Sequence, residues 1–292
     1  MGPSSDPHAP LSPQTPTPTR KPTHKTTPPM PLTATLPPTT PLKTLVDALK
    51  DLVAEGNWHA DADALTLRAM DASHVALCDV RLDAAGFDSY ACAEPVTLGV
   101  NLVSMGKLMK CKRAGDGVTL EAAANGETLD LSFGPPPDAE TAAATTASRA
   151  TYALKLMDID TEALGPPPDA HAITATLASA EFQRVCKDLA SLGDQCALTL
   201  DKTGARFVVS GDVADADVRL GTADVRLAFA QDDDTLTATG AFAVKYLLLF
   251  TKATGLASEV TLSLSTGEPV RVSYVVEGVG RVWYYLAPRV GE

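Results

Sequence analysis

Pairs of basic side chains recur at helical spacing in four separate segments of the sequence. Each pair is spaced i, i+3 or i, i+7, which places both cations on one face of a helix. Helices that touch only phosphates read no base sequence. We therefore predict a nucleic-acid contact that is salt-sensitive and non-specific. The residues are Lys43, Lys50, Lys107, Lys110, Arg184, Lys187, Lys245 and Lys252.

The chain as a whole is acidic, with 24 basic and 36 acidic residues and a formal net charge of -12. Domains that bind nucleic acid usually carry net positive charge. Taken singly, each basic pair is more typical of a solvated helix face. Four pairs at corresponding positions instead favour one positive surface on an otherwise negative molecule. A surface that binds DNA this weakly would release it, so a topological link would have to hold the protein on DNA.

Side chains typical of metal or nucleotide chemistry form no recognisable site in the sequence. The 5 histidines lack zinc-ligand spacing, and the glycine-rich nucleotide motifs and the serine-hydrolase motif are absent. Asp232, Asp233 and Asp234 are consecutive, whereas a two-metal nuclease needs carboxylates that converge from separate elements. The triple is more typical of a turn. We expect no cofactor, no metal and no enzymatic activity, with a metal-dependent nuclease as the remote alternative.

Hydrophobic periodicity places each basic pair on an expected helix. Apolar residues recur at i, i+3, i+4 and i+7 in residues 42–53, the pattern of a one-sided helix. Further helices are expected at 102–110, 180–189 and 242–253, with Ser179 as the N-cap of the third. Strand-like alternation occurs at 64–67, 75–82, 118–121, 128–133, 197–200, 205–210, 218–220, 225–228, 235–239, 260–265, 270–276 and 281–286.

The second half of the chain repeats the order of elements in the first half. The interval from Lys50 to Lys187 is close to that from Lys110 to Lys252, which indicates an internal duplication. With 292 residues and 45% hydrophobic content, the chain is long enough for two cores. We expect a disordered tail at 1–30, similar domains at 31–154 and 174–292, a connector at 155–173 and a flexible loop at 134–148.

The tail, residues 1–29, is rich in Pro and Thr and too poor in apolar residues to form a core. Its basic residues and near-absence of acids would also suit an organellar transit peptide. Met30 is an alternative start, because the folded pattern begins just after it. The 5 cysteines form no C-x-x-C pair and predict a reducing compartment. No apolar run approaches the roughly 18 residues that span a bilayer, so we expect a soluble protein.

Five blocks of the sequence closely resemble the proliferating cell nuclear antigen family of DNA sliding clamps. They are MDASHVAL at 70–77, GVNLVSMGKLMKC at 99–111, LKLMDID at 154–160, FTKA at 250–253 and YYLAP at 284–288. The resemblance as a whole runs from about Leu32 to Val290. The resemblance implies an α+β fold of two pseudo-repeated clamp domains, with helices on one face of antiparallel sheets. It also implies a trimeric ring whose helices line a hole around duplex DNA.

The resemblance assigns roles to particular residues. The basic pairs match positions that line the hole, although Thr44 stands where the family often has another Lys, so contact near the first helix is expected to be weaker. The family's partner site is an apolar pocket that receives a short helical peptide with a glutamine, an aliphatic residue and two aromatics. Its positions here are Met70, His74, Val75, Leu77, Leu164, Pro269, Tyr285, Ala287 and Pro288.

Some of these positions also have ordinary structural explanations. Met70 and Leu77 could be core residues, and His74 could be a structural hydrogen-bonding residue. Pro166 begins a proline run where the family usually has an aliphatic wall residue, which predicts an altered outer rim of the pocket.

Ring closure in the family pairs edge strands of neighbouring chains, here about 149–155 with about 212–220. The expected subunit-interface residues are Arg149, Tyr152, Lys155, Asp212, Ala216 and Val218. Lys202 matches the family's regulatory ubiquitin acceptor.

We therefore expect a processivity factor in the nucleus that tethers DNA polymerase and other replication and repair proteins to duplex DNA. It would be a homotrimer placed on DNA by a clamp loader, without membrane contact. The alternative with the same fold is a subunit of a heterotrimeric checkpoint-type clamp or of another heteromeric ring. The intact pocket motifs favour the homotrimer.

Overall fold

The computed structural model describes residue 2 and residues 31–38, 41–122, 126–135, 148–160, 164–165, 169–231 and 235–289. Apart from Gly2, the expected tail lies outside the described residues, and so does Met30. The same holds for most of the expected loop at 134–148, for Pro166 and for the Asp232 to Asp234 triple.

The two halves of the chain have the same order of elements. The first half contains β1 (Leu32–Leu36), α1 (Leu42–Leu49), β2 (Glu55–Ala60), β3 (Ala64–Met70), β4 (Ala76–Asp83), η1 (Ala84–Gly86), β5 (Ser89–Cys92), β6 (Val96–Asn101), α2 (Leu102–Met109), β7 (Gly117–Ala122), β8 (Thr128–Gly134) and β9 (Ala150–Lys155). The second half contains β10 (Ile173–Ala178), α3 (Ser179–Ala190), β11 (Gln195–Asp201), β12 (Gly204–Val209), β13 (Ala216–Gly221), β14 (Val225–Phe229), β15 (Ala238–Ala243), α4 (Val244–Phe250), η2 (Thr251–Leu256), β16 (Glu259–Leu264), β17 (Val270–Val276) and β18 (Gly280–Leu286). Apart from the short 3-10 helices η1 and η2, each element of the first half has a counterpart in the second.

Antiparallel pairing joins the described strands into three sheets. The five-stranded sheet has the order β5-β1-β7-β8-β9, and the four-stranded sheet has the order β13-β12-β11-β15. The nine-stranded sheet, β14-β10-β16-β17-β18-β4-β3-β2-β6, contains strands of both halves. It crosses between them where β18 pairs with β4, with Val282 opposite Val80. The two halves are therefore joined by backbone hydrogen bonds as well as by the connector.

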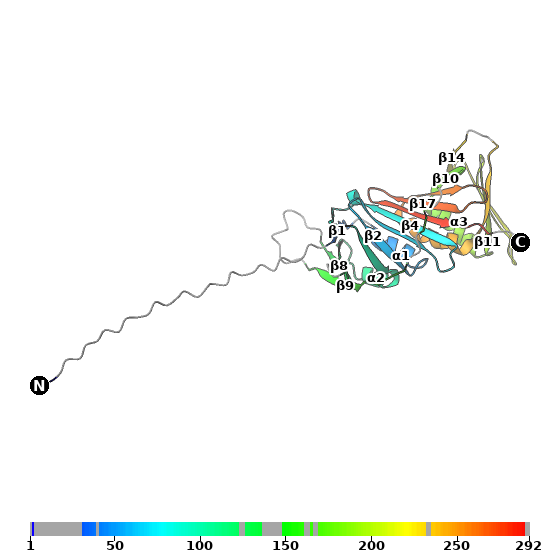
Figure 1. The fold of residues 1–292 in the computed structure, drawn as a ribbon. Coiled ribbons are helices and arrows are strands. Elements are labelled where there is room, and N and C mark those ends of the chain that lie inside the picture. Colours follow the sequence, from blue (N-terminus) through cyan, green and yellow to red (C-terminus); the bar gives the residue numbers. More distant parts are fainter. Residues whose placement is uncertain are drawn as a thin grey trace.

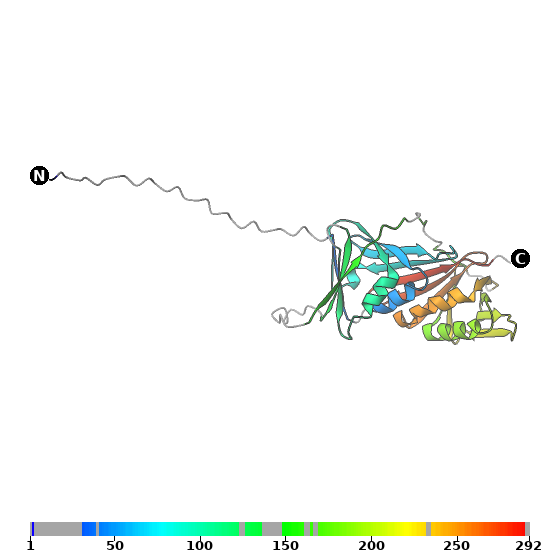
Figure 2. The ribbon, with the colours of Figure 1, turned by 90° about the horizontal axis from the view of Figure 1, so that it is seen from below.

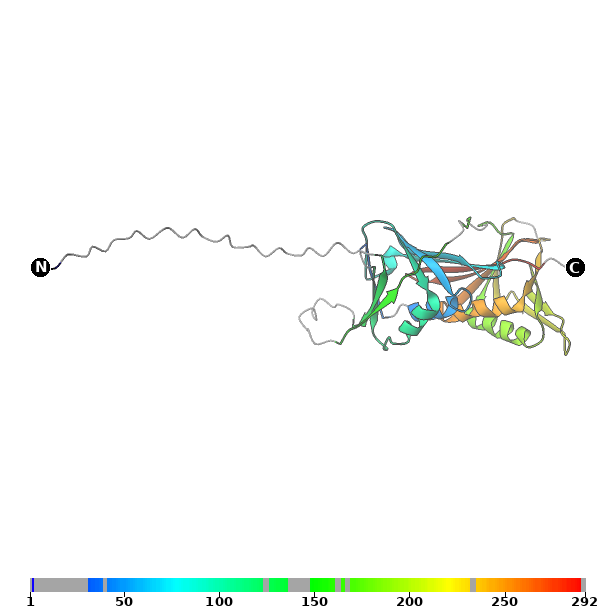
Figure 3. The same ribbon diagram turned by 60° about the horizontal axis from the view of Figure 1, so that its bottom comes forward.

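The four α-helices lie side by side along one face of the sheets (Figures 2 and 3). Helix α1 packs against α2 and η2, and α3 packs against α4 and η2. The Phe250 ring of α4 stacks on Tyr284 of β18, with 4.6 Å between ring centroids. Such aromatic pairs add about 0.5–1.5 kcal/mol beyond the burial of their area. The expected α+β class, with helices on one face of antiparallel sheets, is confirmed.

Two predicted helices are shorter than their periodicity suggested. The first ends at Leu49 rather than at residue 53, because Leu52 and Val53 form turns whose N–H groups donate to the Leu49 carbonyl. The fourth was predicted to start at residue 242, but Phe242 lies in β15, opposite Cys196 of β11, so the helix begins at Val244. After Phe250 the chain continues as the 3-10 helix η2.

Other local predictions were wrong for tertiary reasons. Ser179 lies inside α3, and Ala178 is the N-cap; the Ser179 N–H donates to the Ser258 carbonyl, which fixes it beside β16. The strand predicted at 235–239 begins only at Ala238. Strands β1, β2, β5, β6 and β10 were not predicted, since short strands carry a weak periodic signal.

Candidate DNA-facing helix layer and partner surface

The predicted DNA-facing cations lie on the exposed side of the helix layer. Lys50 is half-buried and the other seven are exposed. In α1, for example, Leu45, Val46 and Leu49 are buried against the sheets while Lys43 points to solvent. Lys50 and Lys110 are the C-caps of α1 and α2, and Lys252 lies in η2, so these three sit just beyond the helices to which the sequence assigned them.

Asp47 lies between the two cations of α1. Its carboxylate accepts hydrogen bonds from Lys43, at 2.6 Å, and from Lys50. Burial disfavours the Asp47 charge, but the two lysines outweigh it and hold the pKa of Asp47 below its ordinary value. The Lys50 stem runs over α2, where a Cβ added to Gly106 would lie 3.0 Å from Lys50 Cδ. One of the two positive charges at α1 is therefore offset within the chain.

Ion pairs also form in the second half, where one cation lies between two carboxylates. Arg184 is held by Glu181 at 2.6 Å and by Asp188 at 2.7 Å, and its hydrogen bond lowers the pKa of Glu181. Lys252 pairs with Asp51, which lies just after α1. This last ion pair joins the two halves on the exposed side of the helix layer.

The remaining four cations form no ion pair among the described residues. Lys107 and Lys110 are exposed at the end of α2. Lys187 donates to the side-chain carbonyl of Gln183 at 3.1 Å, and the Lys245 ammonium lies 4.7 Å from the centroid of the Tyr246 ring. These four are the cations most available to phosphates.

Thr44, which stands where the resemblance suggested another Lys, does not lie on the open face. It is half-buried, and a Cβ added to Gly255 would lie 3.2 Å from Thr44 Cγ2. The close approach of α1 to η2 therefore favours a small side chain at this position.

The predicted partner-peptide residues form one continuous surface across both halves. Met70 lies opposite Leu77, and Leu77 lies opposite Tyr285, in three adjacent strands of the nine-stranded sheet. Pro269, just before β17, and Ala287 and Pro288, just after β18, continue it at the end of the sheet. Met70 and Leu77 are partly exposed and His74 is exposed, whereas Tyr285 is only 4% exposed, so the surface is accessible except at Tyr285.

A buried carboxylate fixes the turn that carries His74 and Val75. Asp71 accepts hydrogen bonds from the N–H groups of Ser73, Val75 and Ala76 and from the Tyr246 hydroxyl at 2.6 Å. Burial disfavours the Asp71 charge, but these donors keep its pKa below the ordinary value. His74 adopts a left-handed backbone, with φ 56. Tyr246 belongs to α4, so the second half of the chain orients a turn of the first.

The start of the connector lies against β6, β2 and β3. The Met157 N–H donates to the Gly99 carbonyl at 2.8 Å, and the Asn57 amide donates to the Ile159 carbonyl at 2.9 Å. Further along, Arg68 donates to the Leu164 carbonyl at 3.4 Å. Leu164 is thereby placed over β3, beside the partner-peptide surface.

The predicted subunit-interface residues lie on two sheet edges toward opposite ends of the folded molecule. Strand β9 is the edge of the five-stranded sheet and β13 the edge of the four-stranded sheet; Figure 1 labels β9 at one end and β11, of the same sheet as β13, near the other. Tyr152 and Lys155 lie in β9, and Ala216 and Val218 in β13. Arg149 and Asp212 lie just before these strands rather than within them.

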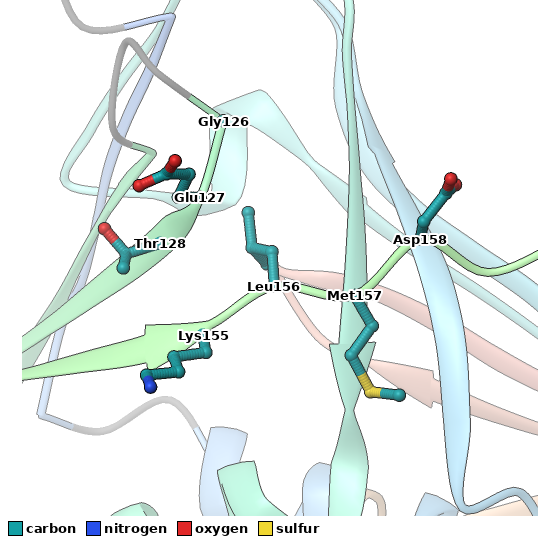
Figure 4. Close-up of a pocket in the computed structure, with 7 residues that line it drawn as sticks. All are labelled: Gly126, Glu127, Thr128, Lys155, Leu156, Met157 and Asp158. Carbon is teal, nitrogen blue, oxygen red and sulfur yellow. The ribbon is translucent and has the colours of Figure 1, made fainter.

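An open hollow lies where β9 passes into the connector (Figure 4). It is lined by Gly126, Glu127, Thr128, Lys155, Leu156, Met157 and Asp158. Close by, a hydrogen bond between the Tyr152 hydroxyl and the Cys111 side chain, which favours the protonated tyrosine, raises the pKa of Tyr152. Lys202 is exposed in the hairpin turn between β11 and β12.

None of the helices among the described residues is long and apolar enough to cross a membrane. In the same part of the chain, no three His, Cys, Asp or Glu side chains are grouped to hold a metal ion.

The carboxylates that pair with the cations were not identified from the sequence. Asp47, Glu181 and Asp188 lie at i±3 or i±4 from their partners, so helical spacing could have revealed them. Asp51 is remote in sequence from Lys252, and no local signal indicates that pair.

Comparison with known families matches nearly the whole chain. Residues 31–163 match the family described as proliferating cell nuclear antigen, N-terminal domain. Residues 167–289 match the family described as proliferating cell nuclear antigen, C-terminal domain.

Proposed function

Because the chain belongs to the proliferating cell nuclear antigen family of DNA sliding clamps, we propose that three copies of it form a ring around duplex DNA. The ring tethers DNA polymerase and other replication and repair proteins, and has no enzymatic activity of its own. Its domains are residues 31–154 and 174–292, joined by the connector at 155–173. A clamp loader places it on DNA in the nucleus.

The way in which the two halves pair is the main support for the proposal. Each of the two strands that join the halves has a counterpart in the other half, and that counterpart is the edge strand of its sheet. Within the chain, β18 pairs with β4. The counterpart of β18 in the first half is β9, and the counterpart of β4 in the second half is β13. Both are edge strands of their sheets. A second chain that supplied β13 to β9 would repeat the internal junction and leave neither edge exposed.

The duplication also predicts the register of that junction. Val282 lies opposite Val80 at the internal junction. Ser132 of β8 lies opposite Thr151, and its counterpart Ser273 of β17 lies opposite Trp283. Thr151 therefore corresponds to Trp283, and the residue before it, Ala150, corresponds to Val282. In the same way Val218, opposite Phe207, corresponds to Val80, which lies opposite Leu67. We therefore expect Ala150 of one chain to lie opposite Val218 of the next, and Tyr152 opposite Ala216.

The helix layer supports the DNA-binding part of the proposal. Its exposed side carries the eight predicted cations, and no helix there presents a row of Arg, Asn and Gln suited to reading bases. Half of the cations pair with carboxylates of the chain. Such a lining attracts phosphates only weakly, which suits a ring that must slide.

The continuous surface around Met70, Leu77 and Tyr285 supports the partner-binding part. It joins aliphatic and aromatic side chains from both halves beside the connector. We propose that it receives the clamp-binding peptides of partner proteins. Lys202, in an exposed turn, is the proposed acceptor for ubiquitin.

A disulfide cross-link tests the ring and its register. Residues opposite each other in an antiparallel pair have Cα atoms about 4.5–5.5 Å apart, within reach of a disulfide. Ala150→Cys with Val218→Cys, in a Cys111→Ser background, should give covalent dimers and trimers under oxidation. Thr151→Cys with Val218→Cys carries the same thiols out of register and should cross-link poorly. A monomer by light scattering and no cross-link would refute the homotrimer; a cross-link only when another clamp subunit is added would favour a heteromeric ring.

A further inference from the structure

A cluster of arginines surrounds Trp283 on the face of the nine-stranded sheet that points away from the helices. Tyr284 faces the helix layer, since its ring stacks on Phe250 of α4. Its neighbours Trp283 and Tyr285 therefore lie on the opposite face. Residues facing one another across β4, β18 and β17 complete the cluster: Arg81 lies opposite Arg281, and Arg271 lies opposite Tyr285. We call Arg81, Arg271, Arg281 and Trp283 the basic-aromatic patch.

The patch carries more positive charge than its surroundings neutralise. Arg81 pairs with Asp83 at 2.6 Å, and Arg271 lies 3.6 Å from the exposed Asp169. Among the described residues, no carboxylate pairs with Arg281, and its buried Nε has no hydrogen-bond partner. Like charges directly opposite in a sheet are destabilising. The fold thus holds Arg81 beside Arg281 at a cost, in a chain whose formal net charge is -12.

Trp283 orients the arginines. The Arg281 guanidinium carbon lies 3.8 Å from the centroid of the Trp283 ring, and that of Arg271 lies 4.9 Å from it. Stacking holds the Arg281 guanidinium in place while leaving its terminal donors free for an oxyanion, whereas Arg271 also donates to Ser263 at 3.5 Å. Because two guanidiniums already lie over the ring, a nucleobase would have to displace one of them to stack there. The geometry therefore favours carboxylates over bases.

The patch begins next to the partner-peptide surface. Trp283 is two residues from Tyr285 on the same face of β18, about 7 Å along the strand. A few residues beyond the end of a peptide bound at Tyr285 could reach Arg281. Val275, which faces Arg281 from β17, is 66% exposed, so the approach to Arg281 from that side is open.

We propose that the basic-aromatic patch binds acidic side chains of a partner protein, in the segment that flanks its clamp-binding peptide. The proposal rests on the peptide site proposed above and adds a charge preference to it. Arg281 is the main residue that donates to the acidic flank, because it is the arginine without a carboxylate of its own. Partners with acidic flanks would then bind more tightly than partners with neutral ones.

Peptide binding to the trimer, followed by fluorescence anisotropy, tests the preference. The probes are synthetic peptides with the glutamine, aliphatic and two aromatic residues, flanked at one end by three Glu or by three Gln. At 50 mM NaCl, a Glu flank at one end should tighten binding about threefold to tenfold over the Gln flank. The gain should shrink at 500 mM NaCl and disappear in Arg281→Gln.

Arg226→Gln is the matched control. Arg226 lies on the same face, in line with Trp283 across β14, β10, β16, β17 and β18, about 19 Å away at four strand spacings. The Arg226→Gln variant loses the same charge as Arg281→Gln and should keep the full gain in affinity from the Glu flank. The proposal is overturned if a Glu flank gives no gain in affinity at either end of the peptide, or if the gain survives Arg281→Gln.

The outcomes separate this inference from the peptide site itself. If Gln-flanked peptides bind and Glu flanks add nothing, only the charge preference fails. If neither kind binds, the peptide site fails and the inference with it. If Glu flanks add nothing while binding of a single-stranded oligothymidylate depends on Arg281, the patch binds nucleic acid instead of an acidic peptide.

Discussion

Asp47 is expected to lower the affinity of the ring for DNA, so Asp47→Asn should raise that affinity. The carboxylate accepts hydrogen bonds from both Lys43 and Lys50, two of the cations proposed to face phosphates. Replacing it with a neutral amide of the same shape releases both lysines in every subunit. The fold should tolerate the change, because a pair as exposed as Lys43 and Asp47, at 51% and 30%, contributes at most about 1 kcal/mol.

The size of the effect follows from counterion release. Each additional phosphate that a lysine engages steepens the dependence of log K on log salt by about 0.9. If one to three of the released lysines of a ring reach the duplex at once, the slope steepens by about 0.9–2.7. Each unit of 0.9 corresponds to about 3.5-fold in affinity across a fourfold change in salt.

Anisotropy of a labelled linear duplex, titrated with the trimer between 50 and 200 mM NaCl, measures this slope. Asp188→Asn is the control, because it removes the same charge while Arg184 remains held by two bonds to Glu181. Asp47→Asn should steepen the slope and Asp188→Asn should change it little. An unchanged or shallower slope for Asp47→Asn, with the fold intact by circular dichroism, would refute the proposed role of the helix layer.

Three further predictions concern the turn, the connector and the partner surface. Asp71→Ala should cost about 2–4 kcal/mol in the free energy of unfolding, since it leaves several buried donors unpaired, Tyr246 among them. Because the pKa of Asp71 is lowered in the fold, the stabilisation by its carboxylate is complete above the ordinary pKa of 3.8 and is lost as pH falls through the folded-state pKa. The unfolding free energies of wild type and variant should therefore converge on acid titration. Parallel curves would contradict this account. Gly99→Ala puts a Cβ 2.0 Å from the Met157 carbonyl oxygen and should lower thermal stability by about 1–3 kcal/mol; an unchanged melting temperature would mean that the connector does not rest on β6. Tyr285→Ala should weaken binding of a clamp-binding peptide about tenfold or more while leaving the trimer intact; unaltered affinity in calorimetry would place the peptide elsewhere.

Much of the fold was predictable from periodicity, because each helix must bury one stripe of apolar residues. In α1 the spacing of Leu42, Leu45 and Leu49 identified the buried face without tertiary information. The ends were less predictable. Phe242 has a side chain that suits a helix or a strand, and only its pairing with Cys196 decides for the strand. Ser179 has the side chain of an N-cap, but its backbone contact with Ser258 places it one residue inside the helix.

The candidate site was predictable in its residue types but not in its internal pairing. Basic pairs at helical spacing identified the exposed side of the helices, and the duplication suggested that this side is shared. The ion pair between Lys252 and Asp51 exists only because η2 packs against α1. Likewise, the bond from Tyr246 to Asp71 depends on how the second half sits on the first. Contacts of this kind leave no periodic trace in a single sequence.

The partner surface illustrates the same limit of local information. Tyr285 and Leu77 are far apart along the chain, and they become neighbours only when β18 pairs with β4. The resemblance in the blocks around them indicated a shared site before any register was known. The resemblance assigns no role to the arginines beside this surface, and only the strand register brings Arg81 and Arg281 together.

We expect the protein to be held on DNA by topology and not by affinity. The direct test is to load the trimer with a clamp loader onto nicked circular DNA, and to follow its retention through gel filtration at high salt. The ring should stay on the circle and leave within minutes once a restriction enzyme linearises the DNA. Equal retention on circular and linearised DNA, or equal loss from both, would contradict the account.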